Sequence, residues 1–163
     1  LVWSAVLVAL CFTFFVRIIC VEGISMEPAL RQNDRVLVLS TLWHAPQNGD
    51  IVVFRKDSFL SEAVIKRIIA TEGQTVDIDY ATSTVYVDGV ALEEDYINEA
   101  MYELPPDYAT HVEVPEGSIF VMGDNRNHSN DSRDVRLGVI DERYVIGRAI
   151  FVVLPFENFG AIE

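Results

Sequence analysis

Short apolar runs separated by turn residues make up most of the chain after residue 20. Runs of about four to eight residues rich in valine and isoleucine, bounded by Gly, Asn or Asp, are typical of β-strands. The pair Asp88-Gly89 stands between VYV and VAL, a strong signal for a two-residue hairpin turn. The sequence therefore predicts a mainly β domain of mixed antiparallel sheets, with strands within residues 35–40, 50–56, 62–70, 75–80, 83–92, 111–124 and 144–155.

An uncharged apolar run opens the chain, from Leu1 to Val16. As a helix this run covers about 24 Å at roughly 1.5 Å per residue, and an extension past Arg17 reaches the ~30 Å of a hydrocarbon core. The long side chain of Arg17 would then reach the membrane interface. We expect an N-terminal transmembrane anchor over residues 1–20, followed by one domain over residues 21–163. Because the chain begins without a methionine, we also expect residues upstream.

Two other interpretations of the apolar run stay open, a helix buried in the core and a cleavable signal peptide. The signal peptide is disfavoured because no basic segment precedes the run and RIICVEG offers no small-x-small cleavage site. A length of 163 residues fits one packed core plus an anchor. We therefore favour the anchor.

The net charge of −13 excludes a nucleic-acid partner, because phosphates demand a basic face. Electrostatics alone would not draw such a body onto anionic lipid either, so apolar contact must hold it at a bilayer. Both cysteines, Cys11 and Cys20, lie in or beside the apolar run, which leaves residues 21–163 without a disulfide or a thiolate metal site. The three histidines lack ligand spacing. We predict no metal and no cofactor.

Ser25 lies in VEGISMEPAL, a few residues after the apolar run. A serine hydroxyl is almost never ionised near neutral pH, so a nucleophilic serine needs a neighbouring base. Lys66 is one candidate, because strand alternation puts it on one face with Val64 and Ile68. It is either a gatekeeper lysine at a sheet edge or a buried lysine whose lowered pKa makes it a general base. The residues alone leave both interpretations open.

Two further segments are rich in polar residues. GDNRNHSNDSR, residues 123–133, must consist of turns and side-chain-to-backbone hydrogen bonds. A calcium loop fits it poorly, because Arg126 and His128 interrupt the acidic pattern. The acidic stretch 93–110 carries Pro105-Pro106, and we expect it to be a variable loop or excursion from the domain.

Four segments in chain order resemble the sequence boxes of the type I signal peptidases: SMEPAL, GDIVVF, KRIIATEG and GDNRNHSNDSR. Each is weak alone, but four in order behind an apolar N-terminus are specific, and the resemblance spans Leu1 to about Pro155. It implies the signal peptidase or LexA-like β fold. It also implies a membrane-anchored serine endopeptidase, a hydrolase that removes signal peptides from exported preproteins. Eukaryotic reticulum relatives generally carry histidine at the position of Lys66, so the resemblance is to the bacterial kind.

The resemblance implies a Ser–Lys dyad, with Ser25 as nucleophile and Lys66 as general base. Some family members supply a second oxyanion donor from a serine two residues before the nucleophile, where this chain has Gly23. We therefore expect the oxyanion to be bound by the backbone N–H of Ser25 and by a backbone N–H near Gly23. The residues that the resemblance implies in support of Lys66 are Ser129, which orients the lysine amine, the Asp131–Arg133 salt bridge, and the Asp124–Arg67 pair.

The family resemblance also implies a preference for small residues, usually alanine, one and three positions before the cut. The residues that match the pocket lining of the family are Val21, Met26, Leu30 and Ile65. The expected partners are signal peptides of preproteins emerging from the secretion machinery, and the lipid bilayer. The implied location is the cytoplasmic membrane of a bacterium, with the catalytic domain on the extracytoplasmic side. Two alternatives stay open, a LexA-like Ser–Lys autoprotease and an inactive membrane-anchored binding domain.

Overall fold

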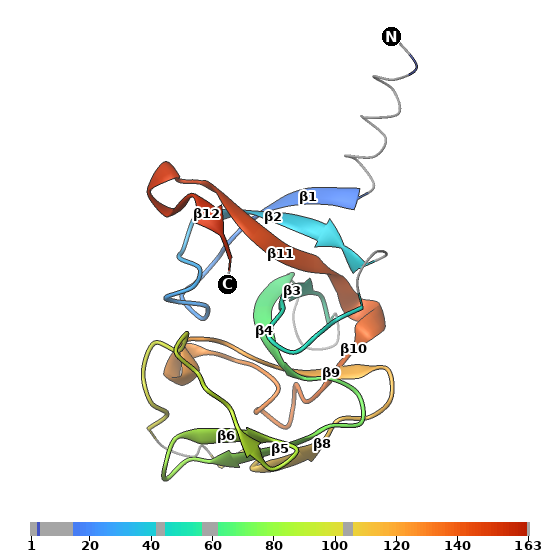
Figure 1. Cartoon of the computed structure of the whole chain (residues 1–163), viewed down its shortest axis with the longest axis vertical. Coiled ribbons are helices and arrows are strands. Elements are labelled where there is room, and N and C mark those ends of the chain that lie inside the picture. The colour runs from blue at the N-terminus through green and yellow to red at the C-terminus, as the bar shows by residue number, and fades with distance from the viewer. Residues whose placement is uncertain (1–2, 4–14, 42–44, 57–61, 103–105, 163) are drawn as a thin grey trace.

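The computed structural model describes residues 3, 15–41, 45–56, 62–102 and 106–162, and these form two antiparallel sheets (Figure 1). The large sheet has the order β1-β2-β11-β3-β4-β9-β10, with β12 paired to β11, and the small sheet has the order β7-β6-β5-β8. The strands of the large sheet are β1 (Val16–Cys20), β2 (Arg35–Ser40), β3 (Ile51–Phe54), β4 (Val64–Ala70), β9 (Ser118–Met122), β10 (Ile140–Asp141), β11 (Val145–Leu154) and β12 (Gly160–Ala161). The remaining elements are β5 (Thr75–Asp79), β6 (Thr84–Val87), β7 (Val90–Ala91), β8 (His111–Glu113) and the 3₁₀ turns η2 (Arg126–His128), η3 (Glu142–Tyr144) and η4 (Phe156–Asn158).

Every run predicted to be a strand contains at least one strand, and β2 occupies the predicted residues 35–40. Run 83–92 is a hairpin of β6 and β7 whose turn residues Asp88 and Gly89 have φ of 51° and 78°, as a type I′ turn requires. Run 111–124 holds two strands, but they are not partners: β8 pairs with β5, and β9 pairs with β4. This run thus connects the two sheets.

The predicted anchor over residues 1–20 is wrong at its C-terminal end. Residues Val16–Cys20 form strand β1, which pairs antiparallel with β2 so that Val16 lies opposite Leu39 and Cys20 opposite Arg35. β-branched residues suit a strand, and the free edge of β2 offers hydrogen-bond partners that override a helix. Residues 1–2 and 4–14 lie outside the described part of the chain. Among the described residues, no helix is long and apolar enough to cross a membrane.

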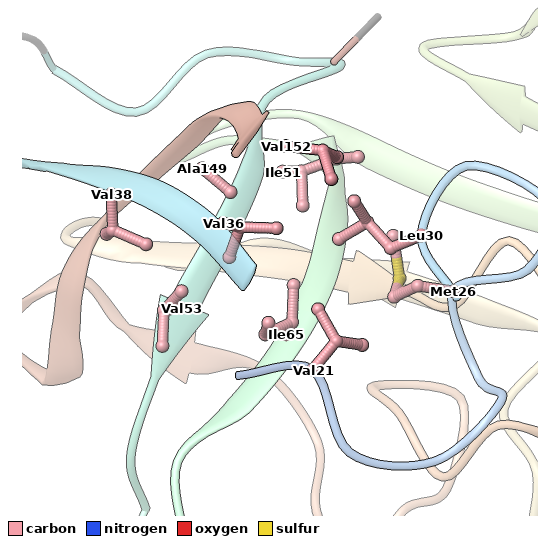
Figure 2. Packing of buried hydrophobic residues seen from close by; sticks show 10 residues of the cluster. All are labelled: Val21, Met26, Leu30, Val36, Val38, Ile51, Val53, Ile65, Ala149 and Val152. Atoms are coloured by element: carbon pink, nitrogen blue, oxygen red, sulfur yellow. The ribbon is translucent and has the colours of Figure 1, made fainter. Parts of the chain in front are cut away.

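A cluster of ten buried apolar residues packs on one face of the large sheet (Figure 2). Val21, Met26 and Leu30, on the segment after β1, contribute to it, and each is at most 3% exposed. Each such side chain stabilises the fold by about 1.5–3 kcal/mol when fully buried. This packing fixes the segment that carries Ser25. The other members are Val36, Val38, Ile51, Val53, Ile65, Ala149 and Val152.

Strand β4 lies in the interior of the large sheet and is buried along six of its seven residues. On one side, β3 pairs with residues 64–67 of β4. On the other side, β9 pairs with β4 only from Arg67 onward. Lys66 therefore lies where one side of β4 is covered by β3 and the opposite edge is not yet paired with β9. Both faces of β4 are buried at this point, and the edge of β4 beside Lys66 is open. The candidate site lies here.

The excursion 93–110 contains no strand or helix among its described residues, but it is tied to the loop 123–133. Glu94 forms a two-point ion pair with Arg126, whose side chain is 1% exposed, with Nη1 and Oε2 at 3.1 Å. The Asn98 N–H donates to the carbonyl of Asp124 at 3.1 Å. The excursion therefore braces the polar loop from outside.

We expect Glu94→Ala to destabilise the fold, because it leaves the Arg126 guanidinium buried without its carboxylate. Breaking a buried pair in this way costs about 3–5 kcal/mol. The measurement is the free energy of unfolding from urea denaturation. Glu93→Ala is the matched control, since Glu93 is exposed and adjacent. An equal, small effect of both substitutions would contradict this account of the excursion.

Candidate active site

Ser25 lies in a tight turn between β1 and β2. Gly23 begins the turn with φ of 81°, a left-handed conformation that glycine adopts without strain. The Glu27 N–H donates to the Ile24 carbonyl at 3.1 Å, and the Leu30 N–H donates to the Met26 carbonyl at 2.9 Å. The turn is thus closed by its own backbone and anchored in the core by the apolar side chains that follow Ser25.

Lys66 is 3% exposed, so of the two interpretations left open the buried lysine is correct. Its Nζ lies 2.7 Å from Ser25 Oγ and 2.9 Å from the carbonyl oxygen of Ile65. Burial lowers the pKa of Lys66 to about 8, and the carboxylates of Asp131 and Asp124 only partly oppose that shift. At pH 7 roughly a tenth of the amine is therefore uncharged, and at pH 8 about half of it.

The loop 123–133 packs against the Ser25 turn at Gly123. A Cβ added at Gly123 would lie 2.5 Å from the Ser25 carbonyl oxygen and closer still to Ser129 Oγ. Glycine is therefore required where the two segments meet. Ser129 Oγ is buried and makes no hydrogen bond with the part of the chain that the structure describes. The structure brings Ser129 beside the turn, but its role in orienting the Lys66 amine stays a prediction.

Arg67 and Asp124 form the expected pair beneath the site. Arg67 Nε and Nη2 each donate to one carboxylate oxygen of Asp124 at 2.9 Å, and Nη1 donates to the carbonyl of Gly49 at 3.0 Å. Burial raises the pKa of Asp124 above its usual value, although Arg67 opposes that change. The guanidinium also lies 4.1 Å from the ring centroid of Tyr96, a cation–π contact from the excursion.

Asp131 and Arg133 form the second expected pair, with Arg133 Nε 2.8 Å from Asp131 Oδ1 and both side chains at most 2% exposed. Burial alone would raise the pKa of Asp131, but the charge and hydrogen bonds of Arg133 hold it below its usual value. The Gly123 N–H donates to Asp131 Oδ2 at 3.0 Å. This pair therefore holds the glycine that contacts the Ser25 turn.

A cavity of about 570 Å³ opens beside Ser25 and Lys66. Three of the four predicted pocket residues line it, namely Val21, Met26 and Ile65. The prediction for Leu30 is wrong, because this side chain has no exposed surface and lies in the core behind the cavity. The remaining lining residues are Cys20, Glu22, Arg55, Glu62, Ala63 and Val64. The cavity is an extended groove between the segment after β1 and the start of β4.

A family model described as "Signal peptidase, peptidase S26" matches residues 1–154 of the chain. The chain belongs to this family. It is 40% identical to "Probable signal peptidase I-1" of Synechocystis sp., across 99% of this chain and 84% of that protein. It is 37% identical to "Signal peptidase I" of Bacillus licheniformis, across 95% of this chain and 86% of that protein.

A solved structure, that of a signal peptidase I from Enterococcus faecalis V583, matches the fold with a TM-score of 0.51. Its sequence is 33% identical, and the match covers 64% of this chain and 96% of that chain. The resemblance to the signal peptidases and the mainly β fold are thus confirmed. Family membership also confirms the prediction of a serine endopeptidase, a hydrolase that removes signal peptides from preproteins.

Several residues of this signal peptidase site escaped sequence reasoning. Asn125 and Arg126 belong to the quoted loop motif, so their motif position was the signal that could have selected them. Glu94 and Tyr96 carried no signal, because their partners lie more than 25 residues away in the chain. Among the described residues, no group of three or more His, Cys, Asp or Glu side chains could hold a metal ion.

We expect Gly123→Ala to abolish most of the peptidase activity. The added methyl group would push the loop away from the Ser25 carbonyl, and a displacement of about 1 Å at a reacting group costs on the order of 100-fold in rate. Cleavage of a preprotein measures it. Gly160→Ala is the control, because a Cβ there meets nothing within 4 Å. A Gly123→Ala enzyme as fast as the wild type would overturn the close approach as a requirement.

Proposed function

We propose that this signal peptidase works by a Ser–Lys dyad and is anchored in the cytoplasmic membrane of a bacterium. One observation carries the mechanism: the amine of a buried lysine, with its pKa near 8, lies 2.7 Å from a serine hydroxyl at the edge of a groove. Nucleophile and base within hydrogen-bond reach are what acyl transfer by serine requires.

The reaction runs through an acyl-enzyme. Ser25 Oγ attacks the scissile carbonyl while the neutral amine of Lys66 takes its proton. The lysinium then donates this proton to the leaving amine as the peptide bond breaks. Water, deprotonated by the same amine, attacks the ester and releases the signal peptide. The oxyanion of both tetrahedral intermediates is bound by the Ser25 N–H, with a second donor near Gly23, each worth about 2.7–4 kcal/mol.

The supporting groups act on the lysine rather than on the substrate. The Asp131–Arg133 and Asp124–Arg67 pairs hold the loop 123–133 and the strand β4 together around Lys66. Burial keeps the pKa of Lys66 at about 8, below its usual value. Asp131 and Asp124 favour the protonated amine, and Arg133 opposes them. Ser129 packs beside the Ser25 turn. The role we propose for its hydroxyl, which makes no hydrogen bond with the described chain, is to orient the amine toward Ser25.

The substrate is a signal peptide with an Ala-x-Ala-like site, bound extended in the groove. Val21, Met26 and Ile65 give the groove its apolar lining, which suits small apolar side chains at alternate positions. The N-terminal segment before β1 anchors the enzyme in the lipid bilayer, and the catalytic domain lies on the extracytoplasmic side. An anchored enzyme meets a membrane-bound preprotein at a raised effective concentration.

Of the two alternatives, the LexA-like autoprotease is disfavoured by the family match along residues 1–154, and the inactive binding domain by the contact between Ser25 and Lys66. No observation favours either over a working peptidase.

Cleavage of a preprotein with an Ala-x-Ala site tests the dyad. In detergent or vesicles, we expect wild type to cut after the second alanine. Ser25→Ala and Lys66→Ala should each lose at least about 10³-fold in kcat, since residues that act as a unit are lost together. Circular dichroism controls for folding. Equal activity of all three folded enzymes would sink the mechanism and revive the binding-domain alternative.

The rate of cleavage should rise with pH, because only the neutral amine of Lys66 accepts the serine proton. With a pKa of about 8, kcat/KM falls about tenfold per unit well below pH 8 and levels off above it. A metal chelator should leave the rate unchanged. A pH–rate profile from pH 6 to 10 measures this dependence, and a rate that stays flat across that range contradicts the assignment of the base.

A further inference from the structure

Asn125 lies in the loop 123–133 and is 2% exposed. Its carbonyl accepts from the His128 N–H of the same loop at 3.0 Å, but both groups through which it donates bind the Ser25 turn. Its backbone N–H donates to the carbonyl oxygen of Ser25 at 3.0 Å. Its side-chain Nδ2 donates to the carbonyl oxygen of Ile24 at 3.1 Å. One residue therefore binds both carbonyl groups that flank the Cα atom of Ser25.

The orientation of the Asn125 amide follows from its partner. A carbonyl oxygen only accepts hydrogen bonds, so Nδ2 and not Oδ1 must face Ile24. Oδ1 is buried and has no hydrogen-bond partner in the described part of the chain. Burying an amide oxygen without a partner costs free energy. The hydrogen bond from Nδ2 to Ile24 offsets that cost and keeps the side chain in this position.

The bond to Ile24 fixes the direction of the Ser25 N–H. In a trans peptide unit the C=O of one residue and the N–H of the next point in opposite directions, and the 24–25 bond is not among the cis bonds of the described chain. Because the Ile24 carbonyl points toward Asn125, the Ser25 N–H points away from the loop 123–133. The cavity is lined by Ser25 itself and by residues 20–22, 26, 55 and 62–66, and none of its lining residues belongs to the loop 123–133.

We propose that Asn125 is a positioning residue that aims the Ser25 N–H into the groove as an oxyanion donor. The Asn125 N–H binds the peptide group that follows the Ser25 Cα atom, and Nδ2 binds the peptide group that precedes it. The Ser25 N–H is therefore oriented before substrate binds. This inference rests on the proposed function and adds to it a residue that touches neither substrate nor Lys66.

The Glu27 N–H also binds the Ile24 carbonyl, at 3.1 Å, so removal of Nδ2 loosens the peptide plane without freeing it. Loss of one oxyanion donor costs about 10²–10³ in kcat. For Asn125→Ala we therefore expect kcat to fall by at least about tenfold, but by less than it would if the donor were lost altogether. KM should stay within about twofold of wild type, because the donor acts on the transition state and not on the bound peptide.

Asn127→Ala is the matched control. Asn127 lies two residues further along the same loop, and its Nδ2 donates to Glu99 Oε1 at 3.0 Å and to the Ala100 carbonyl at 2.9 Å, both on the excursion. A loop merely loosened by loss of an amide would slow both variants alike. We expect Asn127→Ala to keep the wild-type kcat, and both variants to keep the pH midpoint of wild type, since Lys66 is untouched.

A second readout uses a substrate-like peptide aldehyde. Ser25 Oγ bonds to its carbonyl carbon, the serine proton passes to Lys66, and the former carbonyl oxygen occupies the oxyanion position. The inhibition constant of the aldehyde should rise in Asn125→Ala by the same factor as kcat falls, and should not change in Asn127→Ala. An unchanged inhibition constant, equal losses in both variants, or a shifted pH midpoint would overturn the inference.

If Asn125→Ala does not fold, Asn125→Asp keeps the shape and the backbone N–H but replaces the Nδ2 donor with an acceptor. The Asn125→Asp enzyme is compared with wild type at pH 10, where Lys66 is largely neutral. Its kcat should fall at least as much as we expect for Asn125→Ala. Wild-type activity in Asn125→Asp would overturn the inference. Failure of the wild-type enzyme itself to cleave preprotein would instead reject the proposed function, so the two failures are distinguishable.

Discussion

The burial of the Lys66 ammonium group is the constraint on which the rest of the site depends. An unpaired charge inside a sheet is costly, and the protein lowers that cost by releasing the proton, which is why the pKa of Lys66 falls to about 8. Two carboxylates lie near enough to reverse this, but Arg133 and Arg67 pair with them. Burial is thus the largest cause of the lowered pKa, and Arg133 adds to it, whereas Asp131 and Asp124 oppose it.

The loop 123–133 converts that electrostatic arrangement into geometry. Gly123 lets the backbone of the loop approach the Ser25 turn, and the ion pair of Asp131 holds this glycine in place. Asn125 binds the two carbonyls around Ser25. The excursion 93–110 closes the outer side through Glu94 and Tyr96. A buried charge stabilises the fold only when it has a partner, and the excursion supplies the partner of Arg126, so it contributes to the site without lining the groove.

Strand β1 fixes the start of the segment that carries the nucleophile. It pairs with β2 along its whole length, and the Ser25 turn begins at Gly23, three residues after its last residue. Figure 1 shows β1 and β2 at one end of the molecule, with β5, β6 and β8 at the opposite end. In an anchored signal peptidase, this arrangement would keep Ser25 at a set distance from the bilayer.

The sequence by itself determined the runs that form most of the strands and the Asp88-Gly89 hairpin, because alternation and turn chemistry are local properties. Both ion pairs were expected only from the resemblance to a known family. Only the tertiary structure decided that Lys66 is buried, since burial depends on what covers a strand and not on the strand. It likewise turned residues 16–20 into a strand, because an apolar β-branched run suits a helix or a sheet edge, and only β2 offered the partner. The burial of Leu30 behind the groove and the pairing of Glu94 with Arg126 were also decided by the tertiary structure. Contacts between distant segments depend on packing, which no local pattern encodes.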